Sequence, residues 1–324
     1  PPQTTAKKPA SPPPQTTAKK PAPAPTSSNI IIPWCLNVTP PPSRPGWVKP
    51  TTRTVVEIIQ IPAETTSKVD DLFSRAGKRS FIQAMELLEK AKSAEYAVSS
   101  QGGVWKDGSL VHLPANGKAI IIGDLHGHPE NLKRILGKSR AIERLEAGEN
   151  LHLVFLGDYV DRAEPSETGD SEVLEAILEL KVRFPEKIVM LRGNHDAGGC
   201  VEDFPGNLKL HFKENGEDAY EKYKQFFKSL PLAAVSENGV LMLHGGIASG
   251  MKSLDDLVSP SKEVEYEVLW NDPRYDSGDD SSKFKAGDQG FIHNSNRKGK
   301  GIFFFSQHAL RDFFAKTGLR TLVR

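Results

Sequence analysis

The chain has 324 residues, 38% of them hydrophobic, and its 42 Lys and Arg residues nearly balance its 41 Asp and Glu residues. This length predicts one large domain or two smaller ones, and the near-neutral balance argues against a nucleic-acid-binding body. No apolar run approaches the roughly 20 residues that a membrane-spanning helix needs. Two cysteines cannot form a disulfide framework, which favours a reducing compartment and a cytoplasmic location.

Residues 1–52 are rich in Pro, Thr and Lys and are predicted to form a disordered tail and linker. The decapeptide PPQTTAKKPA occupies residues 1–10 and recurs at residues 13–22. It offers no apolar side chain large enough for a core, so ordering it would cost conformational entropy without compensation. The first 29 residues hold four Lys and no acid, so we interpret the tail as a solvated spacer, with a binding partner for this Pro-rich segment as the alternative. Because the first residue is Pro1, we expect further residues upstream, and a signal peptide among them stays open.

Globular patterning begins near residue 53, and residues 53–324 are predicted to form one catalytic domain. Its first part combines a strand and a helix. The weak alternation in residues 53–61 indicates a strand. Ser80 and Gln83 form a capping-box signature, and apolar residues then recur at helical spacing as far as Ala91.

A hairpin and four short apolar runs follow along the chain. The hairpin is predicted at residues 104–113, with Asp107 and Gly108 as its turn. Each apolar run has the length of a buried strand. The runs are KAIIIG at residues 118–123, LHLVFLG at 151–157, KIVMLRG at 187–193 and GVLMLHG at 239–245. Helical patterns at residues 173–180, 220–227 and 307–316 alternate with them or follow them, which predicts an α/β fold, a layered αββα sandwich with flanking helices. The last helix has Ser306 as its candidate N-cap and Gly318 as its candidate stop.

Ligand-type side chains follow each apolar run at the point where its strand is expected to end. They are Asp124 and His126 after the first run, Asp158 after the second, Asn194 and His195 after the third, and His244 after the fourth. In α/β sheets, sites form at the carboxyl ends of strands, where adjacent glycines allow close backbone approach. One such motif is weak because Gly–Asp is common in turns, but four in order predict a metal site. The histidines outside these motifs are expected to be structural or superficial.

The motifs GDLHG, GDYVDR, GNHD and HGG resemble those of the calcineurin-like metallophosphoesterases, and more narrowly those of the PPP-type protein serine/threonine phosphatases. They stand at residues 123–127, 157–162, 193–196 and 244–246. Further similar stretches are VRFP at 182–185, LWNDP at 269–273, and Asn296–Arg297. The resemblance covers roughly residues 79–324 and implies a layered sandwich that holds two metal ions.

The resemblance also implies a role for each matching residue: five metal ligands, two residues for proton transfer and two for phosphate binding. The metal ligands are Asp124 and His126 for one ion, Asp158 as the bridge, and Asn194 and His244 for the other; the proton-transfer residues are His195, as general acid, and Asp161; the phosphate-binding residues are Arg162 and Arg297. Mixed oxygen and nitrogen ligands suit Mn, Fe or Zn. A hydroxide activated by both metals would hydrolyse phosphate monoesters, with phosphoserine and phosphothreonine of a phosphoprotein partner as the expected substrates.

The sequence departs from the family's pattern at several positions. The family has a further metal-binding His shortly after an Arg that aligns with Arg324, so we expect a chain truncated at its C-terminus, and a weakly occupied second metal site if it ends there. Asp196 stands where protein phosphatases usually have Glu. Residues 163–165 replace a usual Gly, and the loop that leads to Asp170 is acidic.

These departures leave two alternatives to a protein phosphatase. The first is a hydrolase of dinucleoside polyphosphates or other small phosphoesters, with the same two-metal chemistry. The second is a catalytically inactive module that binds phosphorylated partners and uses the Pro-rich tail as a tether.

Overall fold

The computed structural model describes residues 67–94, 103–162, 168–197, 203–274, 290–295 and 301–324. The chain divides into two compact units, residues 1–32 and 33–324, and all of the described residues belong to the second unit. The predicted tail, the strand predicted at residues 53–61, and Arg297 lie outside the described residues. No helix in the described part of the chain is both long enough and apolar enough to cross a membrane.

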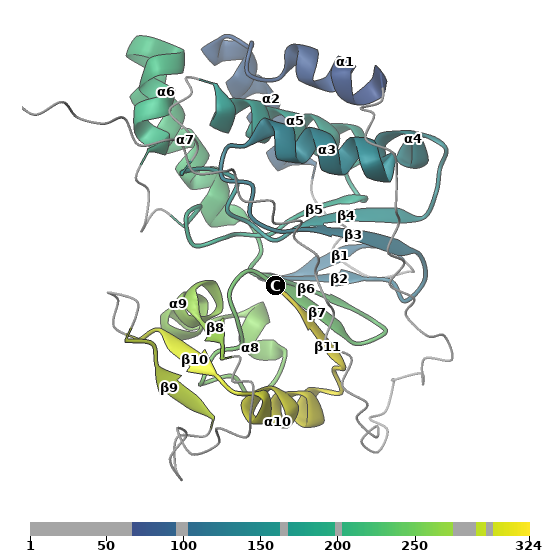
Figure 1. Cartoon of the computed structure of the whole chain (residues 1–324), viewed down its shortest axis with the longest axis vertical. Coiled ribbons are helices and arrows are strands. Elements are labelled where there is room, and N and C mark those ends of the chain that lie inside the picture. The colour runs from purple at the N-terminus through teal and green to yellow at the C-terminus, as the bar shows by residue number, and fades with distance from the viewer. Residues whose placement is uncertain (1–66, 95–102, 163–167, 198–202, 275–289, 296–300) are drawn as a thin grey trace, which may run out of the picture. The chain divides into compact units, whose positions relative to one another are not determined.

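Two β-sheets form the centre of the domain (Figure 1). The first sheet is parallel, with the order β3 (Lys118–Ile122), β4 (Leu151–Phe155), β5 (Ile188–Met190). The second is mixed, with the order β1 (Trp105–Asp107), β2 (Leu110–Leu113), β6 (Ala233–Ser236), β7 (Val240–Leu243), β11 (Thr321–Val323). The predicted hairpin is the antiparallel β1–β2 pair. Its turn is Gly108–Ser109 rather than the predicted Asp107–Gly108, because Asp107 is still in β1 and pairs with Leu110. The four apolar runs are β3, β4, β5 and β7, so three of them lie in the first sheet and one in the second.

The two sheets pack face to face through a shared apolar core. Val154 of β4 and Val189 of β5 belong to the same buried cluster as Val111 of β2 and Met242 of β7. The alternate residues of β4, such as Leu153, pack against helices on the other face. Both faces of β4 are therefore buried, which explains why the sequence shows continuous apolar runs rather than alternation with polar residues.

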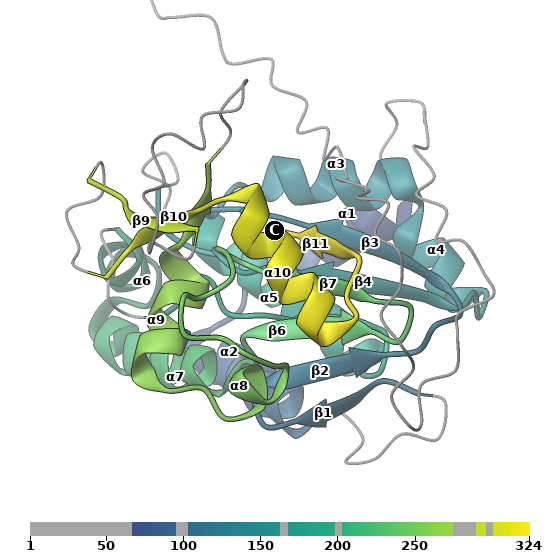
Figure 2. The ribbon, with the colours of Figure 1, turned by 90° about the horizontal axis from the view of Figure 1, so that it is seen from below.

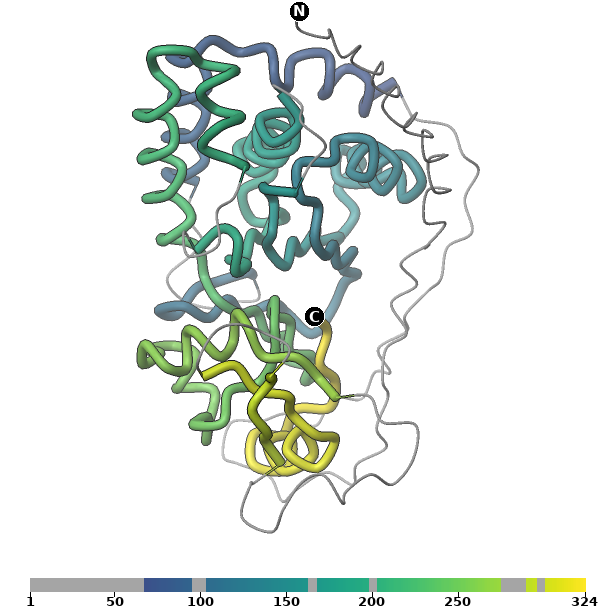
Figure 3. Tube along the Cα trace, turned by 60° about the vertical axis from the view of Figure 1, so that its left-hand side comes forward, coloured from purple at the N-terminus to yellow at the C-terminus, as the bar shows by residue number. Residues whose placement is uncertain are grey.

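Helices cover the outer face of each sheet (Figures 1 and 3). The first sheet is covered by helices that share one core with it: α1 (Ser67–Arg75), α2 (Phe81–Ser93), α3 (Pro129–Ser139), α4 (Ala141–Glu146), α5 (Gly169–Arg183), α6 (Phe204–Phe212) and α7 (Gly216–Ser229), with a 3-10 turn at Lys213–Asn215. The second is covered by α8 (Asp255–Val258), α9 (Lys262–Trp270) and α10 (Gln307–Thr317). The predicted αββα layering is confirmed.

A small third sheet lies next to α9, with the order β8 (Asp272–Pro273), β10 (Phe303–Phe305), β9 (Phe291–His293). Strand β10 leads directly into α10, which packs on the second sheet through Phe313 and Phe314 (Figure 2). The predicted capping residues of α10 are confirmed, and the helix runs one residue beyond the predicted 307–316. The Ser306 hydroxyl accepts the Ala309 N–H at the helix start, and Gly318 ends the helix with a left-handed φ of 77°.

Candidate metal centre

The loops that follow β3, β4, β5 and β7 bring the predicted ligands together. Two groups of metal-ligand side chains occur in the described part of the chain: His126, Asp158 and His195 in one, and Asp124, Asp158 and His244 in the other. The ligand atoms in each group lie within 4.8 Å of one another. Asp158 belongs to both groups, which is the position that a bridging carboxylate needs.

His126 presents one ring nitrogen to the centre because the other is bonded to the backbone. Its Nδ1 lies 2.9 Å from the Val160 carbonyl oxygen, which can only accept, so Nδ1 carries the proton. Nε2 then keeps its lone pair and lies 3.5 Å from Asp158 Oδ2. In metal-binding histidines, a hydrogen bond from the ring nitrogen that does not bind the metal fixes the tautomer and the ring orientation.

Asp158 is held in a left-handed backbone conformation, with φ of 53°, and only 2% of it is exposed. Its Oδ1 accepts the backbone N–H of His195 at 2.9 Å. The other oxygen, Oδ2, lies 3.5 Å from Nε2 of both His126 and His244. One carboxylate oxygen is thus fixed by the protein, and the other faces two imidazoles.

Asn194 and His244 meet across the two sheets. Asn194 Oδ1 and His244 Nε2 lie at hydrogen-bond distance, 2.7 Å. Asp124 is the most exposed member of the centre; its carboxylate lies 3.9 Å from His244 Nδ1 and 3.8 Å from His126 Nε2.

The donor set fits metal ions. His126 Nε2, His195 Nε2 and His244 Nδ1 are buried and have no hydrogen-bond partner among the described residues. A buried polar atom without a partner costs about 1–3 kcal/mol, and an ion coordinated by such nitrogens removes that cost. Imidazole, carboxylate and amide donors together suit Mn, Fe or Zn.

His195 and Asp161 form a buried pair beside this centre. Both side chains are fully buried, and His195 Nδ1 lies 3.0 Å from Asp161 Oδ2. The remaining ring nitrogen, Nε2, is the one without a partner among the described residues. The His126 and His195 rings meet edge to face, with centroids 4.9 Å apart. Nε2 of His195 is therefore the ring nitrogen available to a ligand or to proton transfer.

Asp196 has a structural role that the sequence did not reveal. Its carboxylate accepts the backbone N–H groups of Asp158 at 2.7 Å, Gly193 at 2.8 Å and Tyr159 at 3.1 Å. It therefore joins the loop after β4 to the loop after β5. Burial raises the pKa of Asp196 well above its ordinary value, and the nearby charge of Asp158 raises it further. Because Asp196 is 1% exposed, the replacement of the family's usual Glu changes the support of the site rather than its surface.

The glycines of the second and third motifs allow these two loops to touch. A Cβ on Gly193 would lie 2.2 Å from Asp158 Oδ1, and one on Gly157 would lie 2.1 Å from the Gly193 nitrogen. Gly157 also has φ of 108°, a conformation that side chains disfavour. The close approach brings Asp158 next to Asn194 and His195, which follow β5.

The loop that carries His244 is supported from outside the centre. The N–H groups of Gly245 and Gly246 both donate to the Val268 carbonyl in α9. Asn271, fully buried, donates to the Ile247 carbonyl at 3.0 Å and accepts the Phe303 N–H at 2.7 Å. The LWNDP stretch that resembled the family therefore supports the HGG loop through Asn271.

The two predicted phosphate-binding residues differ in what the structure describes. Arg162 directly follows Asp161, is exposed and has a left-handed φ of 61°; Arg297 lies outside the described residues. The histidines outside the motifs have other surroundings. His112 stacks on Trp105 with centroids 3.8 Å apart, and His152 is buried in β4 with its pKa lowered by burial to about 4.

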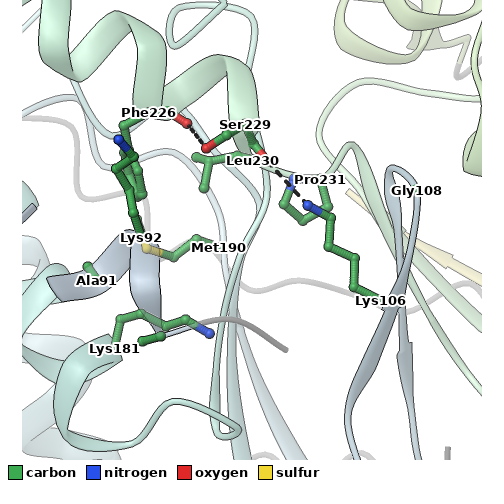
Figure 4. Close-up of a pocket in the computed structure, with 11 residues that line it drawn as sticks. Ala91, Lys92, Lys106, Gly108, Lys181, Met190, Phe226, Ser229, Leu230 and Pro231 are labelled. Carbon is green, nitrogen blue, oxygen red and sulfur yellow. Dashed lines mark hydrogen bonds between the residues drawn. The ribbon is translucent and has the colours of Figure 1, made fainter. Parts of the chain in front are cut away.

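A separate cavity of about 260 Å³ lies among α2, α5, α7 and the β1–β2 hairpin and contains none of the predicted site residues (Figure 4). Lys181, which lines it, donates to the carbonyls of Pro185 at 2.6 Å and Ile188 at 3.1 Å. These bonds join the end of α5 to β5, which gives Lys181 a structural role.

A family model described as calcineurin-like phosphoesterase matches residues 117–324. The chain belongs to this family. It is 28% identical over 188 residues to a probable serine/threonine-protein phosphatase of Encephalitozoon cuniculi, a match that covers 55% of this chain and 39% of that protein. It is 32% identical over 180 residues to a serine/threonine-protein phosphatase of Caenorhabditis elegans, covering 52% of this chain and 37% of that protein. The chain therefore spans well under half the length of either relative.

A solved structure of a protein serine/threonine phosphatase from Saccharomyces cerevisiae, described as similar to human phosphatase PP5, matches with a TM-score of 0.55 at 21% identity. The match covers 78% of this chain and 75% of that chain. At this identity the likeness shows the fold alone. The predicted family and the layered sandwich are confirmed, and the role of each site residue stays a prediction.

Proposed function

We propose that this domain hydrolyses phosphate monoesters, with phosphoserine and phosphothreonine of a protein as the substrate. The observation that carries the proposal is the convergence of Asp124, His126, Asp158, Asn194 and His244 beside a fully buried His195–Asp161 pair. The names of the two curated relatives, both serine/threonine phosphatases, support the substrate class.

Two metal ions, Mn, Fe or Zn, would be held by Asp124 and His126 on one side, Asn194 and His244 on the other, and Asp158 between them. When bound, such a pair neutralises the phosphoryl charge and lowers the pKa of a water to make it nucleophilic. The backbone N–H that His195 donates to Asp158 ties the proposed acid to the proposed bridge. The centre and the acid are thereby placed by the same loop contacts.

His195 would donate a proton from Nε2 to the leaving serine or threonine oxygen. Asp161 receives the Nδ1 hydrogen bond at 3.0 Å, so it fixes the ring orientation and stabilises the imidazolium. Arg162 would bind the phosphoryl oxygens as a charge-assisted donor. General-acid catalysis of this kind contributes about 10²- to 10⁴-fold to a rate.

The test is His195→Ala in the full-length, metal-loaded protein, with turnover of a phosphoserine peptide and metal content measured together. We expect kcat to fall by about 10²- to 10⁴-fold, while both metals remain bound. His308→Ala is the matched control, because His308 is 75% exposed on α10, and it should change neither quantity. Undiminished turnover would refute the acid assignment, and loss of one metal would instead make His195 a ligand.

The turnover of a phosphopeptide and of a dinucleoside polyphosphate, compared at equal concentration, decides between the phosphoprotein proposal and the small-molecule hypothesis. Asp196, which kept that hypothesis open in the sequence, binds three backbone N–H groups and is 1% exposed, so it does not select a substrate by contact. Preference for the nucleotide would overturn the phosphoprotein proposal. Binding of a phosphopeptide without turnover of either substrate would favour the inactive module.

A further inference from the structure

Asp161, the partner of His195, is held by a second buried carboxylate. Asp161 has φ of 68°, a left-handed conformation that residues with a side chain disfavour. Its backbone N–H donates to Asp170 Oδ1 at 3.2 Å. Asp170 lies in the first turn of α5 and is 1% exposed. The bond fixes the Asp161 backbone to α5.

The carboxylate of Asp161 is fixed by a different helix, α6. The backbone N–H groups of Asp203 and Phe204, at the start of α6, donate to Asp161 Oδ1 at 3.1 and 2.8 Å. Oδ2 is thereby directed to His195 Nδ1. The positive end of a helix also favours a negative charge at this place.

One side-chain contact joins these two supports. Asn207 in α6, 8% exposed, donates from Nδ2 to Asp170 Oδ2 at 2.8 Å. Asp170 thus accepts the Asp161 backbone with one oxygen and Asn207 with the other. The backbone of Asp161 is therefore held by α5 and its carboxylate by α6, and the Asn207–Asp170 hydrogen bond joins these two helices.

We propose that Asp170 and Asn207 are positioning residues for the general acid: they fix Asp161, and through it the His195 ring, so that Nε2 points to the leaving group. The proposal rests on the proposed function only in so far as His195 acts as an acid. Each of the two lies in a helix outside the four sequence motifs.

Both hydrogen bonds need Asp170 as an acceptor. The pKa of Asp170 is raised to about 6, chiefly by burial and in smaller part by the charges of Asp161 and Asp203, while its two hydrogen bonds oppose the rise. Asp170→Ala removes both bonds. Asp170→Asn can keep both, because its oxygen can accept from Asp161 and its amide can donate to an Asn207 amide that has turned over.

The experiment compares two substrates in the full-length protein: a phosphoserine peptide, whose alkoxide leaves poorly, and p-nitrophenyl phosphate, whose phenolate leaves without an acid. We expect Asp170→Ala and Asn207→Ala to lower kcat on the peptide by about 10- to 100-fold, and on the aryl ester by less than about 3-fold. Asp170→Asn should stay within about 3-fold of the parent on both substrates. Asp218→Ala, an exposed acid in α7, is the control and should change neither.

Equal slowing of both substrates by Asp170→Ala would overturn the proposal, since general damage does not depend on the leaving group. If Asp170→Ala fails to fold, Asn207→Ala decides by the same criterion. A second readout needs no turnover: the His195 Nδ1–H proton resonance should be present in the parent and in Asp170→Asn, and broadened or shifted in Asp170→Ala. An unchanged resonance in Asp170→Ala refutes the positioning role, whereas an inactive parent with the expected resonances refutes only the proposed function.

Discussion

The loops after β3, β4 and β5 supply four of the five proposed metal ligands, whereas the loop after β7 supplies one, His244. The first three loops hold one another. The N–H groups of Leu125 and His126 both donate to the Asp158 carbonyl at 2.9 Å, and Asp196 binds the backbone of Asp158. The β7 loop is instead supported by α9 and by Asn271.

This difference predicts different responses to damage. In the first sheet a change to one loop displaces the others, because each is the other's hydrogen-bond partner. In the second sheet we expect His244 to be displaced alone, because the backbone of its loop is supported by α9 and Asn271 rather than by the loops of the first sheet. A substitution that separates the loops of the first sheet should therefore abolish binding of both metals. A substitution that displaces the loop after β7 should abolish binding of one.

The largest effect is expected from Gly193→Ala. The new Cβ would lie 2.2 Å from Asp158 Oδ1 and 2.3 Å from the Asp158 nitrogen. The loops after β4 and β5 must separate, which should cost at least about 3 kcal/mol of unfolding free energy and remove both metals. Urea denaturation and metal analysis measure the two quantities.

Gly123→Ala is the matched control within the same set of motifs. A Cβ at Gly123 would meet nothing within 4 Å, although Gly123 directly precedes the proposed ligand Asp124. We expect a change below about 1 kcal/mol and full metal content. If Gly123→Ala is as damaging as Gly193→Ala, the loop-contact explanation is wrong.

A smaller and more local effect is expected from Asn271→Ala in the second region. The change leaves the Ile247 carbonyl and the Phe303 N–H without the partner that Asn271 provides, at a cost of about 1–3 kcal/mol. His244 should lose its place, so metal content should fall from two ions to one. Exposed Asn131, changed to Ala, should have no such effect.

The His195 Nδ1–H resonance distinguishes local from general damage in this variant. It should persist in Asn271→Ala, because Asp161 and His195 are supported by α5, α6 and the first sheet. Its loss, or the loss of both metals, would show that the two regions are coupled more tightly than their hydrogen bonds indicate.

The sequence predicted features whose cause is local. The Ser80–Gln83 capping box, the hairpin and the Ser306 and Gly318 ends of α10 depend on neighbours within a few residues, and all are present. Only the hairpin turn lies one residue later than predicted, at Gly108–Ser109. The four motifs also follow the ends of β3, β4, β5 and β7 as predicted, because the position of a residue relative to its own strand does not depend on long-range packing.

The supports of the site could not be predicted, because each depends on residues far apart in the chain. Asp196 was noticed only as an unusual residue, yet it binds the loop 38 positions earlier. Asp170 and Asn207, 37 positions apart, belong to no motif. Nothing in the residues around Asn207 indicates that its amide meets a carboxylate in another helix.

The smallest predicted effect concerns pH and contrasts one histidine from each sheet. Burial lowers the pKa of His152, in β4, to about 4 from an ordinary 6.5. The unfolded chain then binds more protons than the folded one, so the stability contribution is complete above about pH 6.5 and is lost as the pH falls toward 4. At pH 5 the loss is about 2 kcal/mol. His152→Gln should remove that part of the acid sensitivity, measured as the difference in unfolding free energy between pH 7.5 and pH 5.

His112, in β2 of the second sheet, is the natural comparison for His152. Burial also lowers its pKa, but the charges of Asp107 and Glu237 act in the opposite direction. The sign of its contribution is the same, and we expect its size to be smaller. His112→Gln should therefore reduce the acid sensitivity less than His152→Gln. An equal or larger reduction would show that the charges of Asp107 and Glu237 do not offset the burial of His112.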